Sequence, residues 1–367
     1  MNPNLEGYIA INDMRIGIYD PYLDDLGGGE KYMMSIASCL SEKHKVTVFW
    51  DKKEDFDKIF ERFAIDLSKV NLSENIFSPK YPFLKRALKT REFDVIIALS
   101  DGSIPLVFSR RTLIHFQSPI PKIKIDLKTR LKFLKVSKIF CNSYYTKSYI
   151  DKDFKIKTMV LYPPIDINAK DIKKENTILH VGRFRARNVG NDDYKKQNVM
   201  IDVFKDMIDK GLKGWSFILA VGLQEEDKNS FEKMQAKTKG YPIKFMINKA
   251  NKELWELYSI SKIYWHASGF GEDLENHPEY AEHFGISTVE AMSAGCVPVV
   301  INAGGQKEIV EDGINGFVWN TLDELRIQTM ELINSSTLLE KMSKKAKIRS
   351  LDFAGGRFSQ EVFSLLK

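Results

Sequence analysis

Residues 282–301 read EHFGISTVEAMSAGCVPVVI, and this stretch carries the clearest signal of the fold. It contains a loop with a glycine, a helix-like stretch at Ser287–Ala294, and an apolar, β-branched run at Val297–Ile301. Another strand-like run, Ile263–His266, precedes it. Strands that alternate with helices are typical of parallel sheets joined by crossover helices. We therefore expect an α/β domain here.

The same alternation extends outward over the whole chain. Further strand-like runs are Arg15–Asp20, Val46–Asp51, Asp94–Ser100, Leu113–Gln117, Lys138–Asn142, Thr177–Gly182, Ser216–Val221, Ile243–Ile247 and Gly316–Trp319. Further helix-like stretches are Glu30–Lys43, Lys195–Lys210, Lys228–Lys237, Leu322–Asn334, Leu338–Lys347 and Phe358–Leu366. The pattern occurs twice, which predicts an α/β fold of two Rossmann-like, doubly wound domains. At about 150 residues per domain, the 367 residues also indicate two.

The adjacent prolines Pro163 and Pro164 mark the expected join, because they deny helix and fix an extended connection. We expect an N-terminal domain over 1–164 and a C-terminal domain over 165–350. Residues 351–367 form a C-terminal helix that we expect to return to the first domain. In open α/β sheets, ligands bind beyond the carboxyl ends of the strands. The two domains are therefore expected to face a central cleft that holds the site.

The charge balance argues against one class of partner. Lys and Arg number 55 against 49 Asp and Glu, so the net charge is +6, too small to indicate nucleic acid. An anionic small molecule or an anionic membrane surface suits a mildly basic protein. Hydrophobic residues make up 43% and charged residues 28%, as in an ordinary globular protein.

The cysteines are widely spaced and form no CxxC pair; they are Cys39, Cys141 and Cys296. This excludes a disulfide scaffold and a cysteine-based zinc site, and it suits a reducing cytosol. The first residues contain no apolar core of signal-peptide length, and no run approaches the roughly 20 apolar residues that cross a bilayer. There is no HExxH motif, and we expect no bound metal. We predict a cytoplasmic protein that is soluble or lies on the cytosolic face of a membrane.

Two segments are suited to hold a phosphate. Residues 26–30, LGGGE, follow the first strand and open the first helix, where glycines let an anion approach helix N–H groups. The alternative is a simple turn. Residues 180–184, HVGRF, end a strand, and Lys195-Lys196-Gln197 begins the next helix. An arginine and a lysine there would neutralise a diphosphate, and the alternative is ordinary surface charge.

Two glutamates, Glu282 and Glu290, are separated by seven residues with a glycine between them. Ser287-x-x-Glu290 is a capping box, which predicts a helix that begins at Ser287. Glu282 then lies in the preceding loop and Glu290 in the first turn, so that both carboxylates can face the cleft. The alternative is that Glu290 only caps Ser287 and that Glu282 is a solvated acid.

Two more segments follow strands. Residues 302–308, NAGGQKE, open a short helix, and the N–H groups of the turn suit a phosphate or sugar hydroxyls unless this is only a tight turn. His115 lies in a strand-end segment, LIHFQSP, where it either faces the cleft or is structural.

The segment 121–138, PKIKIDLKTRLKFLKVSK, holds seven Lys or Arg and one Asp among apolar residues. A basic amphipathic segment can bind an anionic bilayer, at about 1 kcal/mol per basic residue. The alternative is a solvated helix face. Residues 80–91, KYPFLKRALKTR, can add to the same surface.

Together these motifs resemble the retaining glycosyltransferases of family 4, which have the GT-B architecture. The motifs come in the right order: GGGE, IHF, GRF then KKQ, EHFGISTVE followed by AMSAGCVPVV, and GGQKEIVEDGINGF. The EHFG and VEAMSAG block is the specific part. In motif the chain is most similar to dolichol-linked and polysaccharide α-mannosyltransferases.

The resemblance implies a nucleotide-diphosphate sugar bound mainly by the second domain. Arg183 and Lys195 would hold the diphosphate with Lys196 beside it. Glu290 would bind the ribose hydroxyls, and Glu282, the first candidate catalytic residue, would contact the donor sugar. Residues 185–194 lengthen the gap between arginine and lysine relative to the family, so that either Lys195 or Lys196 is the phosphate ligand.

The resemblance also implies contacts made by backbone and by the first domain. Backbone around Phe284 and Gly285 would touch the sugar or the phosphate. Gly28 and Gly29 would approach the diphosphate. His115, the second candidate catalytic residue, would lie near the reacting carbon and the acceptor.

The expected function is that of a metal-independent, retaining hexosyltransferase with no cofactor. It would move a hexose, with mannose favoured, from a GDP-sugar (or a UDP-sugar) to a glycan or lipid-linked acceptor. Fixed cations and N–H dipoles would stabilise the departing diphosphate. The alternatives are a GT-B-fold sugar-nucleotide epimerase or hydrolase, and a non-catalytic nucleotide-sugar-binding protein.

Overall fold

The computed structural model describes residues 13–120, 127–165, 167–170, 172–186 and 193–367. By its contacts the chain forms two compact units. The first comprises residues 1–115, 124–140 and 362–367, and the second comprises 116–123 and 141–361. The predicted join at Pro163-Pro164 lies in sequence between the strands of the first sheet and those of the second. The boundaries of the compact units fall elsewhere, after residues 115, 123, 140 and 361.

The first sheet has seven strands in the order β3-β2-β1-β4-β5-β6-β7. The strands are β1 Arg15–Tyr19, β2 Lys45–Phe49, β3 Asn71–Ser73, β4 Val95–Ser100, β5 Arg111–Phe116, β6 Lys138–Cys141 and β7 Met159–Val160. Strand β1 pairs in parallel with β2 and with β4, so the strand order reverses at β1 and β4. The carboxyl ends of strands at such a reversal are the usual ligand position in an open α/β sheet.

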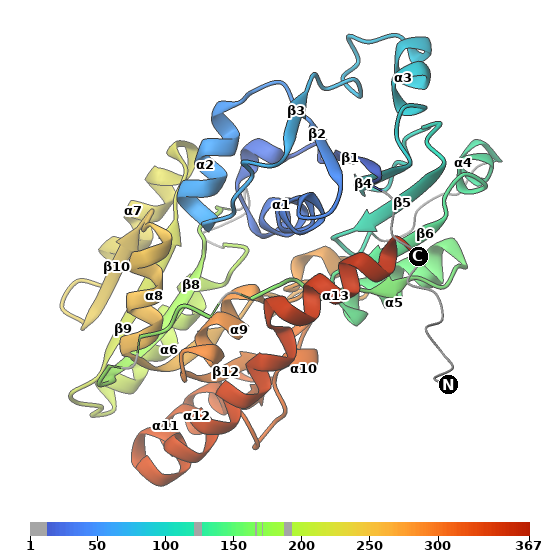
Figure 1. The fold of residues 1–367 in the computed structure, drawn as a ribbon. Coiled ribbons are helices and arrows are strands. Elements are labelled where there is room, and N and C mark those ends of the chain that lie inside the picture. Colours follow the sequence, from blue (N-terminus) through green and yellow to red (C-terminus); the bar gives the residue numbers. More distant parts are fainter. Residues whose placement is uncertain (1–12, 121–126, 166, 171, 187–192) are drawn as a thin grey trace, which may run out of the picture. The chain divides into compact units, whose positions relative to one another are not determined.

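The helices that connect these strands are α1 Gly28–Ser41, α2 Glu54–Phe63, α3 Phe83–Thr90, α4 Leu127–Phe133 and α5 Tyr144–Phe154. Figure 1 shows α1 beside the strands of this sheet. Helix α1 buries an apolar face that includes Met33, Ile36 and Leu40. On the sheet, Ile16 and Ile18 alternate with Gly17, where a Cβ would lie 2.8 Å from the ring of Phe49. The close packing therefore favours glycine at this position.

The second sheet has six strands in the order β10-β9-β8-β11-β12-β13. They are β8 Glu175–Arg183, β9 Ser216–Gly222, β10 Ile243–Ile247, β11 Ser261–His266, β12 Val297–Ile301 and β13 Phe317–Trp319. All the neighbouring pairs are parallel, and the order reverses between β8 and β11. This sheet therefore also has a reversal point.

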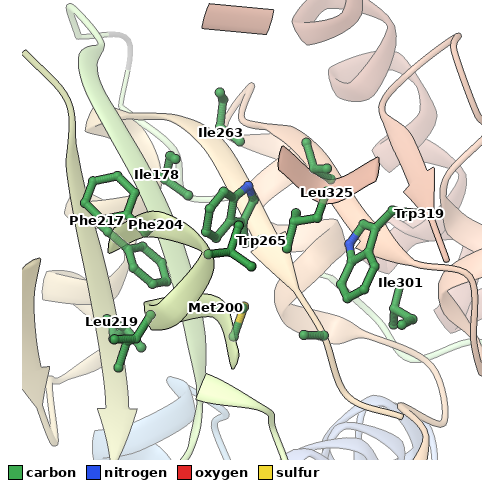
Figure 2. Packing of buried hydrophobic residues seen from close by; sticks show 14 of the residues in the cluster. Ile178, Met200, Phe204, Phe217, Leu219, Ile263, Trp265, Ile301, Trp319 and Leu325 are labelled. Atoms are coloured by element: carbon green, nitrogen blue, oxygen red, sulfur yellow. The ribbon is translucent and has the colours of Figure 1, made fainter. Parts of the chain in front are cut away.

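The helices of this part are α6 Gln197–Asp209, α7 Lys228–Ala236, α8 Asn251–Ile260, α9 Ile286–Ser293, α10 Gln306–Ile309, α11 Leu322–Asn334, α12 Ser336–Ser350 and α13 Gly355–Leu365. Figure 2 shows Trp265 at the centre of the core, among Phe217, Phe204 and Leu325. Its indole Nε1 donates to Thr329 Oγ1 at 3.0 Å, which satisfies the one polar atom of the ring. The buried tryptophan ties β11 to α11 behind the carboxyl edge of the sheet.

The chain end groups with the first unit. Residues 362–367 belong to it, and Arg111 donates to the carbonyl of Leu366. Lys138 Nζ also donates to the Ser364 carbonyl at 3.3 Å. The last turn of α13 is therefore tied to strands β5 and β6.

All the strands predicted from the sequence are present. The short strands β3 and β7 and the helices α2, α3, α5 and α8 are additions to the predicted pattern. Helix α5 shows why: its sequence, YYTKSYIDKDF, has a weak apolar period, and its start is fixed by Ser143 Oγ, which accepts from Thr146 N at 3.1 Å.

The three cysteines are free thiols. Cys39 is partly exposed on α1, whereas Cys141 and Cys296 are buried. Burial raises the pKa of Cys141 to about 12, and burial also raises the pKa of Cys296. In the part of the chain that the structure describes, no helix combines the length and apolar character needed to cross a membrane.

Candidate functional site

The reversal point of the second sheet brings several predicted site residues together. Strands β8 and β11 end there, at Arg183 and His266. His180, three residues before the end of β8, is buried, and its ring lies 6.1 Å from the ring of His266. A Cβ at Gly182 would lie 2.9 Å from His180 Nε2 and 3.4 Å from Lys195 Cγ. Glycine at 182 therefore leaves room for these two side chains.

Lys195, Glu282 and His266 form one cluster at this edge. Lys195 Nζ donates to Glu282 Oε2 at 2.7 Å, and His266 Nε2 lies 3.0 Å from the same oxygen. Because an ionised carboxylate only accepts, the histidine carries its hydrogen on Nε2. The Glu282 side chain is 21% exposed and that of Lys195 28%, so both stay within reach of a ligand.

The charges of this cluster follow from its surroundings. Burial alone would raise the pKa of Glu282, but the Lys195 ammonium and the His266 hydrogen bond outweigh it and hold that pKa well below its ordinary value. Burial lowers the pKa of His266 although Glu282 opposes it, and burial lowers the pKa of His180 to about 3. At neutral pH Glu282 is therefore a carboxylate beside the Lys195 ammonium. His266 and the neighbouring His180 are neutral imidazoles.

Helix α9 begins one residue earlier than the capping box predicts, and the box does not form. Gly285 is the N-cap, with φ +119°, and no side chain caps the helix. The Ser287 hydroxyl instead pairs with the Tyr264 hydroxyl at 2.8 Å. Glu290 accepts a hydrogen bond from the Tyr258 hydroxyl at 2.9 Å. The predicted loop position of Glu282 is correct, whereas Glu290 lies beyond the first turn.

The two lysines differ in their surroundings. Lys196 is 5% exposed, has φ +56°, and pairs with Glu272 at 2.6 Å. It stands at the N-cap of α6. Lys195 is partly exposed and directed at Glu282. Of the two, Lys195 has the geometry to reach a bound anion, and Lys196 is part of a buried ion pair.

The predicted turn at Gly304 and Gly305 lies against the loop that carries Glu282. The N–H of Gly305 donates to the Glu282 carbonyl at 2.8 Å, so this donor is not available to a ligand. At Gly304, φ is +61° and a Cβ would lie 2.1 Å from the same carbonyl oxygen. The side chain of Phe284 is a core residue, packed on Tyr162 and Phe353. The tight-turn alternative therefore describes this segment, which fixes the backbone of Glu282.

The glycine turn of the first unit starts α1 as predicted. Gly28 is exposed and Gly29 buried in the first turn, and the first N–H groups of any α-helix lack intrahelical acceptors. Glu30 folds back to accept from the N–H of Gly27 at 2.5 Å. Asp20, just after β1, is also buried, and burial followed by the charge of Glu30 raises its pKa to about 8. Asp20 is thus mostly neutral at pH 7.

His115 is fully buried in the first unit, at the end of β5. Its ring lies between those of Tyr32 and Phe140, at 4.6 and 4.8 Å. Nδ1 donates to the Phe140 carbonyl at 3.2 Å, and burial lowers its pKa to about 3. Nε2 therefore carries a lone pair, and within the described part of the chain it has no hydrogen-bond partner. The structure makes His115 a neutral acceptor rather than a cation.

Two expectations depend in part on residues outside those that the structure describes. Of the basic segment 121–138, residues 121–126 lie outside them, as do residues 187–192 in the gap before Lys195. Within the described residues, no three His, Cys, Asp or Glu side chains gather as a metal site.

Sequence reasoning missed His266, Tyr258 and Tyr264. A signal existed for His266 and Tyr264, because both belong to the strand-like run Ile263–His266 and such strands end at the ligand edge. Tyr258 lies in α8, which the sequence pattern does not predict, and its partner Glu290 is 32 residues away.

Two family models of known proteins match parts of this chain. The family model for glycosyl transferases group 1 matches residues 164–349, which carry the whole Arg183, Lys195, Glu282 and Glu290 set. The chain belongs to this family. The model for Glycosyltransferase Family 4 matches residues 26–169, which include the glycine turn and His115. The protein is therefore a glycosyltransferase, and its two sheets are those of the GT-B fold.

Among curated proteins the glycosyltransferase is similar to mannosyltransferases. It is 22% identical to the GDP-Man:Man(3)GlcNAc(2)-PP-Dol alpha-1,2-mannosyltransferase of Dictyostelium discoideum, over 97% of this chain and 85% of the relative. It is 27% identical to the Xenopus laevis protein of the same name, over 61% of this chain and 46% of that relative.

Solved structures share its fold. The Anabaena protein HepE, solved with UDP and glucose, superposes with a TM-score of 0.71 at 18% identity, over 96% of this chain and 99% of that one. A glycosyltransferase from Rickettsia africae gives 0.73 at 15% identity, over 96% and 98%. At this identity the likeness concerns the fold alone.

Proposed function

We propose that this glycosyltransferase is a retaining hexosyltransferase that uses a nucleotide-diphosphate sugar, with GDP-mannose as the favoured donor. The acceptor is a glycan or a lipid-linked glycan, and the reaction needs no metal. The observation that carries the proposal is the cluster at the reversal point of the second sheet, where Lys195 and His266 hold one oxygen of Glu282. The similarity to GDP-Man-dependent relatives, over 97% of the chain in one case, supports the choice of donor.

The roles follow from charge and position. Arg183 and Lys195 bind the diphosphate, Lys195 in preference to the buried Lys196. Glu282 accepts from hydroxyls of the donor sugar, and Glu290 accepts from the ribose hydroxyls. When the sugar–phosphate bond breaks, the diphosphate gains negative charge. Fixed cations stabilise that charge without reorganisation, and loss of one such contact costs about 10²–10³ in rate.

The first unit supplies the remaining groups. Gly28 and Gly29 approach the diphosphate with the N–H groups at the start of α1, which favour an anion. His115 is neutral, and its Nε2 can accept a hydrogen bond from a hydroxyl of the acceptor or of the sugar. His115 would thus contribute a neutral hydrogen-bond acceptor, whereas Lys195 would contribute a positive charge.

A lipid-linked acceptor requires access to a membrane surface, and two helices of the first unit suit this. Helix α3 exposes Phe83, Leu84 and Leu88. The segment around it, residues 80–91, contains five Lys or Arg and no acid. Near α4, Leu131 and Leu134 are 59% and 80% exposed. Apolar side chains among cations fit an anionic bilayer, so we propose peripheral binding on the cytosolic face.

Binding and turnover test the donor assignment. Purified protein is titrated with GDP, UDP and ADP, and then incubated with GDP-mannose with and without a lipid-linked oligosaccharide. We expect GDP to bind tightest, Arg183→Ala to weaken it at least tenfold, and GDP release to require the acceptor. The same rate in EDTA is expected. Donor consumption without acceptor would support the epimerase or hydrolase alternative, and binding without turnover would support a non-catalytic protein.

Sedimentation with vesicles tests the membrane surface. We expect binding to vesicles that contain phosphatidylserine, and a loss of at least fivefold in Leu84→Ser/Leu88→Ser. The matched control is Ile327→Ser/Ile348→Ser, which changes two side chains of similar exposure, on α11 and α12. Equal vesicle binding by both variants would contradict the proposal that the α3 surface binds the membrane.

A further inference from the structure

A buried tyrosine lies against one of the two carboxylates. Tyr258, in α8, is 1% exposed, and its hydroxyl donates to Glu290 Oε2 at 2.9 Å. Burial, and then the charge of Glu290, raises the pKa of this phenol well above its ordinary value. The hydroxyl therefore stays protonated and can act only as a donor toward the carboxylate at neutral pH.

Such a bond fixes the direction of a flexible group. A glutamate side chain has several rotatable bonds, and ordering it on binding a ligand costs free energy. Two adjacent hydroxyls are recognised by a carboxylate only when its oxygens are oriented toward both. A donor that already holds one oxygen removes part of the ordering cost. Tyr258 is itself held in the core by packing on Trp255, at 5.5 Å between ring centres, so it is a rigid support.

A second buried tyrosine makes a comparison possible. Tyr264, in β11, is fully buried, and its hydroxyl pairs with Ser287 Oγ at 2.8 Å, on the same helix α9 as Glu290. It lies 3.4 Å from the Val181 carbonyl as well. The two tyrosines thus support one helix in the same way, but only Tyr258 has a hydrogen bond to the carboxylate among the contacts of these residues that the structure describes.

We propose that Tyr258 is a positioning residue for recognition of the ribose diol of the nucleotide, and that it acts through Glu290. The inference rests on the proposed role of Glu290 and adds the residue that gives that role its geometry. Tyr258 does not touch the nucleotide itself. Its contribution therefore depends on the ribose hydroxyls and disappears when they are absent.

Binding of two nucleotides separates positioning from simple support of the fold. Dissociation constants of GDP and 2′,3′-dideoxy-GDP are measured by calorimetry for the native protein, Tyr258→Phe, Tyr264→Phe and Glu290→Gln. We expect the native protein to bind the dideoxy nucleotide at least tenfold more weakly than GDP. Tyr258→Phe should weaken GDP about fivefold, the usual effect of one hydrogen bond, and leave dideoxy binding unchanged. Tyr264→Phe should keep the native ratio.

The double variant Tyr258→Phe/Glu290→Gln distinguishes an effect through Glu290 from a general effect on the fold. If the tyrosine acts only through the glutamate, removing its hydroxyl in the Glu290→Gln background changes neither constant further. Thermal melts of each variant confirm that it is folded. Should Tyr258→Phe fail to fold, the same measurements on protein with fluorinated tyrosines test the bond through its donor strength, and an unchanged ratio would count against the proposal.

The outcomes distinguish the two levels of the argument. If Glu290→Gln abolishes the preference for GDP while Tyr258→Phe keeps it in full, the positioning role is overturned and the ribose role of Glu290 stands. If Glu290→Gln keeps the preference, the ribose role itself fails, and the positioning role fails with it. A loss of the preference in Tyr264→Phe equal to that in Tyr258→Phe would also overturn the inference, because helix support would then explain both.

Discussion

At the carboxyl edge of the second sheet, Glu282 and Glu290 each accept a hydrogen bond from a buried ring, that of His266 or of Tyr258. At the corresponding edge of the first sheet, Asp20 accepts a backbone N–H, that of Tyr22 at 2.9 Å. Its second oxygen is buried and has no hydrogen-bond partner among the residues that the structure describes. Its pKa is raised to about 8. At Glu282 the Lys195 ammonium and the His266 hydrogen bond keep the carboxylate charged, whereas burial without such partners leaves Asp20 protonated.

The same contrast applies to the histidines. His266 donates to a charged partner, while His115 lies between two aromatic rings with Nε2 unpartnered. The second edge is therefore a charged site that exists before a ligand binds. At the first edge Asp20 is mostly protonated beside the charge of Glu30, and His115 is neutral, which suits contacts with hydroxyls.

Lys195→Ala tests the charged edge and should have the largest effect. Removing the cation takes away the proposed diphosphate contact and one partner of Glu282, so kcat/KM should fall by about 10²–10³. Lys196→Met should instead reduce the free energy of unfolding, because it removes one side of the mostly buried ion pair with Glu272, at a cost of about 3 kcal/mol. Steady-state kinetics and denaturant unfolding separate the two. A larger kinetic loss in Lys196→Met would reverse the assignment of the lysines.

The variant Asp20→Asn tests whether the Asp20 carboxyl at the first edge is protonated. The pKa of Asp20 is raised from 3.8 to about 8, so between these values the folded state holds a proton that the unfolded state has released. The free energy of unfolding should therefore fall as pH rises through this window, by up to about 1.4 kcal/mol per pH unit from this group. Asn carries no such proton, so the variant should be more stable at pH 8, by ~2–4 kcal/mol, and the gain should shrink toward pH 4.

Urea unfolding of both proteins from pH 4 to 9 measures this. Asp24→Asn is the control, because Asp24 is an exposed acid on the neighbouring turn. Parallel stability curves for the native protein and Asp20→Asn would mean that Asp20 is ionised throughout, and the contrast between the edges would be lost.

His115→Phe tests whether the neutral ring does more than pack. Phenylalanine keeps the aromatic contacts but removes the Nε2 acceptor and the bond to the Phe140 carbonyl. We expect kcat/KM to fall about tenfold, the scale of one hydrogen bond made in the reaction, and the free energy of unfolding to fall by about 1 kcal/mol from the lost bond to Phe140. Transfer kinetics at several acceptor concentrations show whether KM for the acceptor changes too. Full activity would assign His115 to the core alone.

Glu42→Gln should have the smallest effect. Glu42 and Lys69 form an ion pair at 2.8 Å, but both side chains are more than half exposed. Solvent screening makes such a pair worth less than about 0.5 kcal/mol. A loss above 1 kcal/mol on denaturant unfolding would mean that exposed pairs in this protein matter as much as the partly buried pair of Lys195 and Glu282.

The sequence predicts some elements to the residue. The strands β10 and β12 and the helix α11 have the predicted bounds, because β-branched or amphipathic runs there end at clear breaks. The start of α9 was off by one residue, because the hydroxyl of Ser287 bonds to Tyr264 from another strand rather than to its own helix. A local sequence pattern cannot predict a hydrogen-bond partner, such as Tyr264, that lies on another element.

The site shows the same limit. Spacing puts Glu282 in a loop, which is correct, and begins a helix at Lys195, whereas α6 begins two residues later, at Gln197. The side chains of Lys195 and Glu282 meet beside His266, the last residue of β11. This contact depends on the pairing of β8 with β11, which the residue pattern does not predict.

The unequal burial of the three thiols has a practical use. Cys141 and Cys296 are buried and have raised pKa values, so few thiolates form there at neutral pH, and thiol reagents react with the thiolate. Cys39, on α1, is the accessible one. A maleimide dye should therefore label the native chain at one position, on the helix that begins with the glycine turn. Fluorescence from that dye would test the proposed donor contact at the glycine turn without any engineered residue.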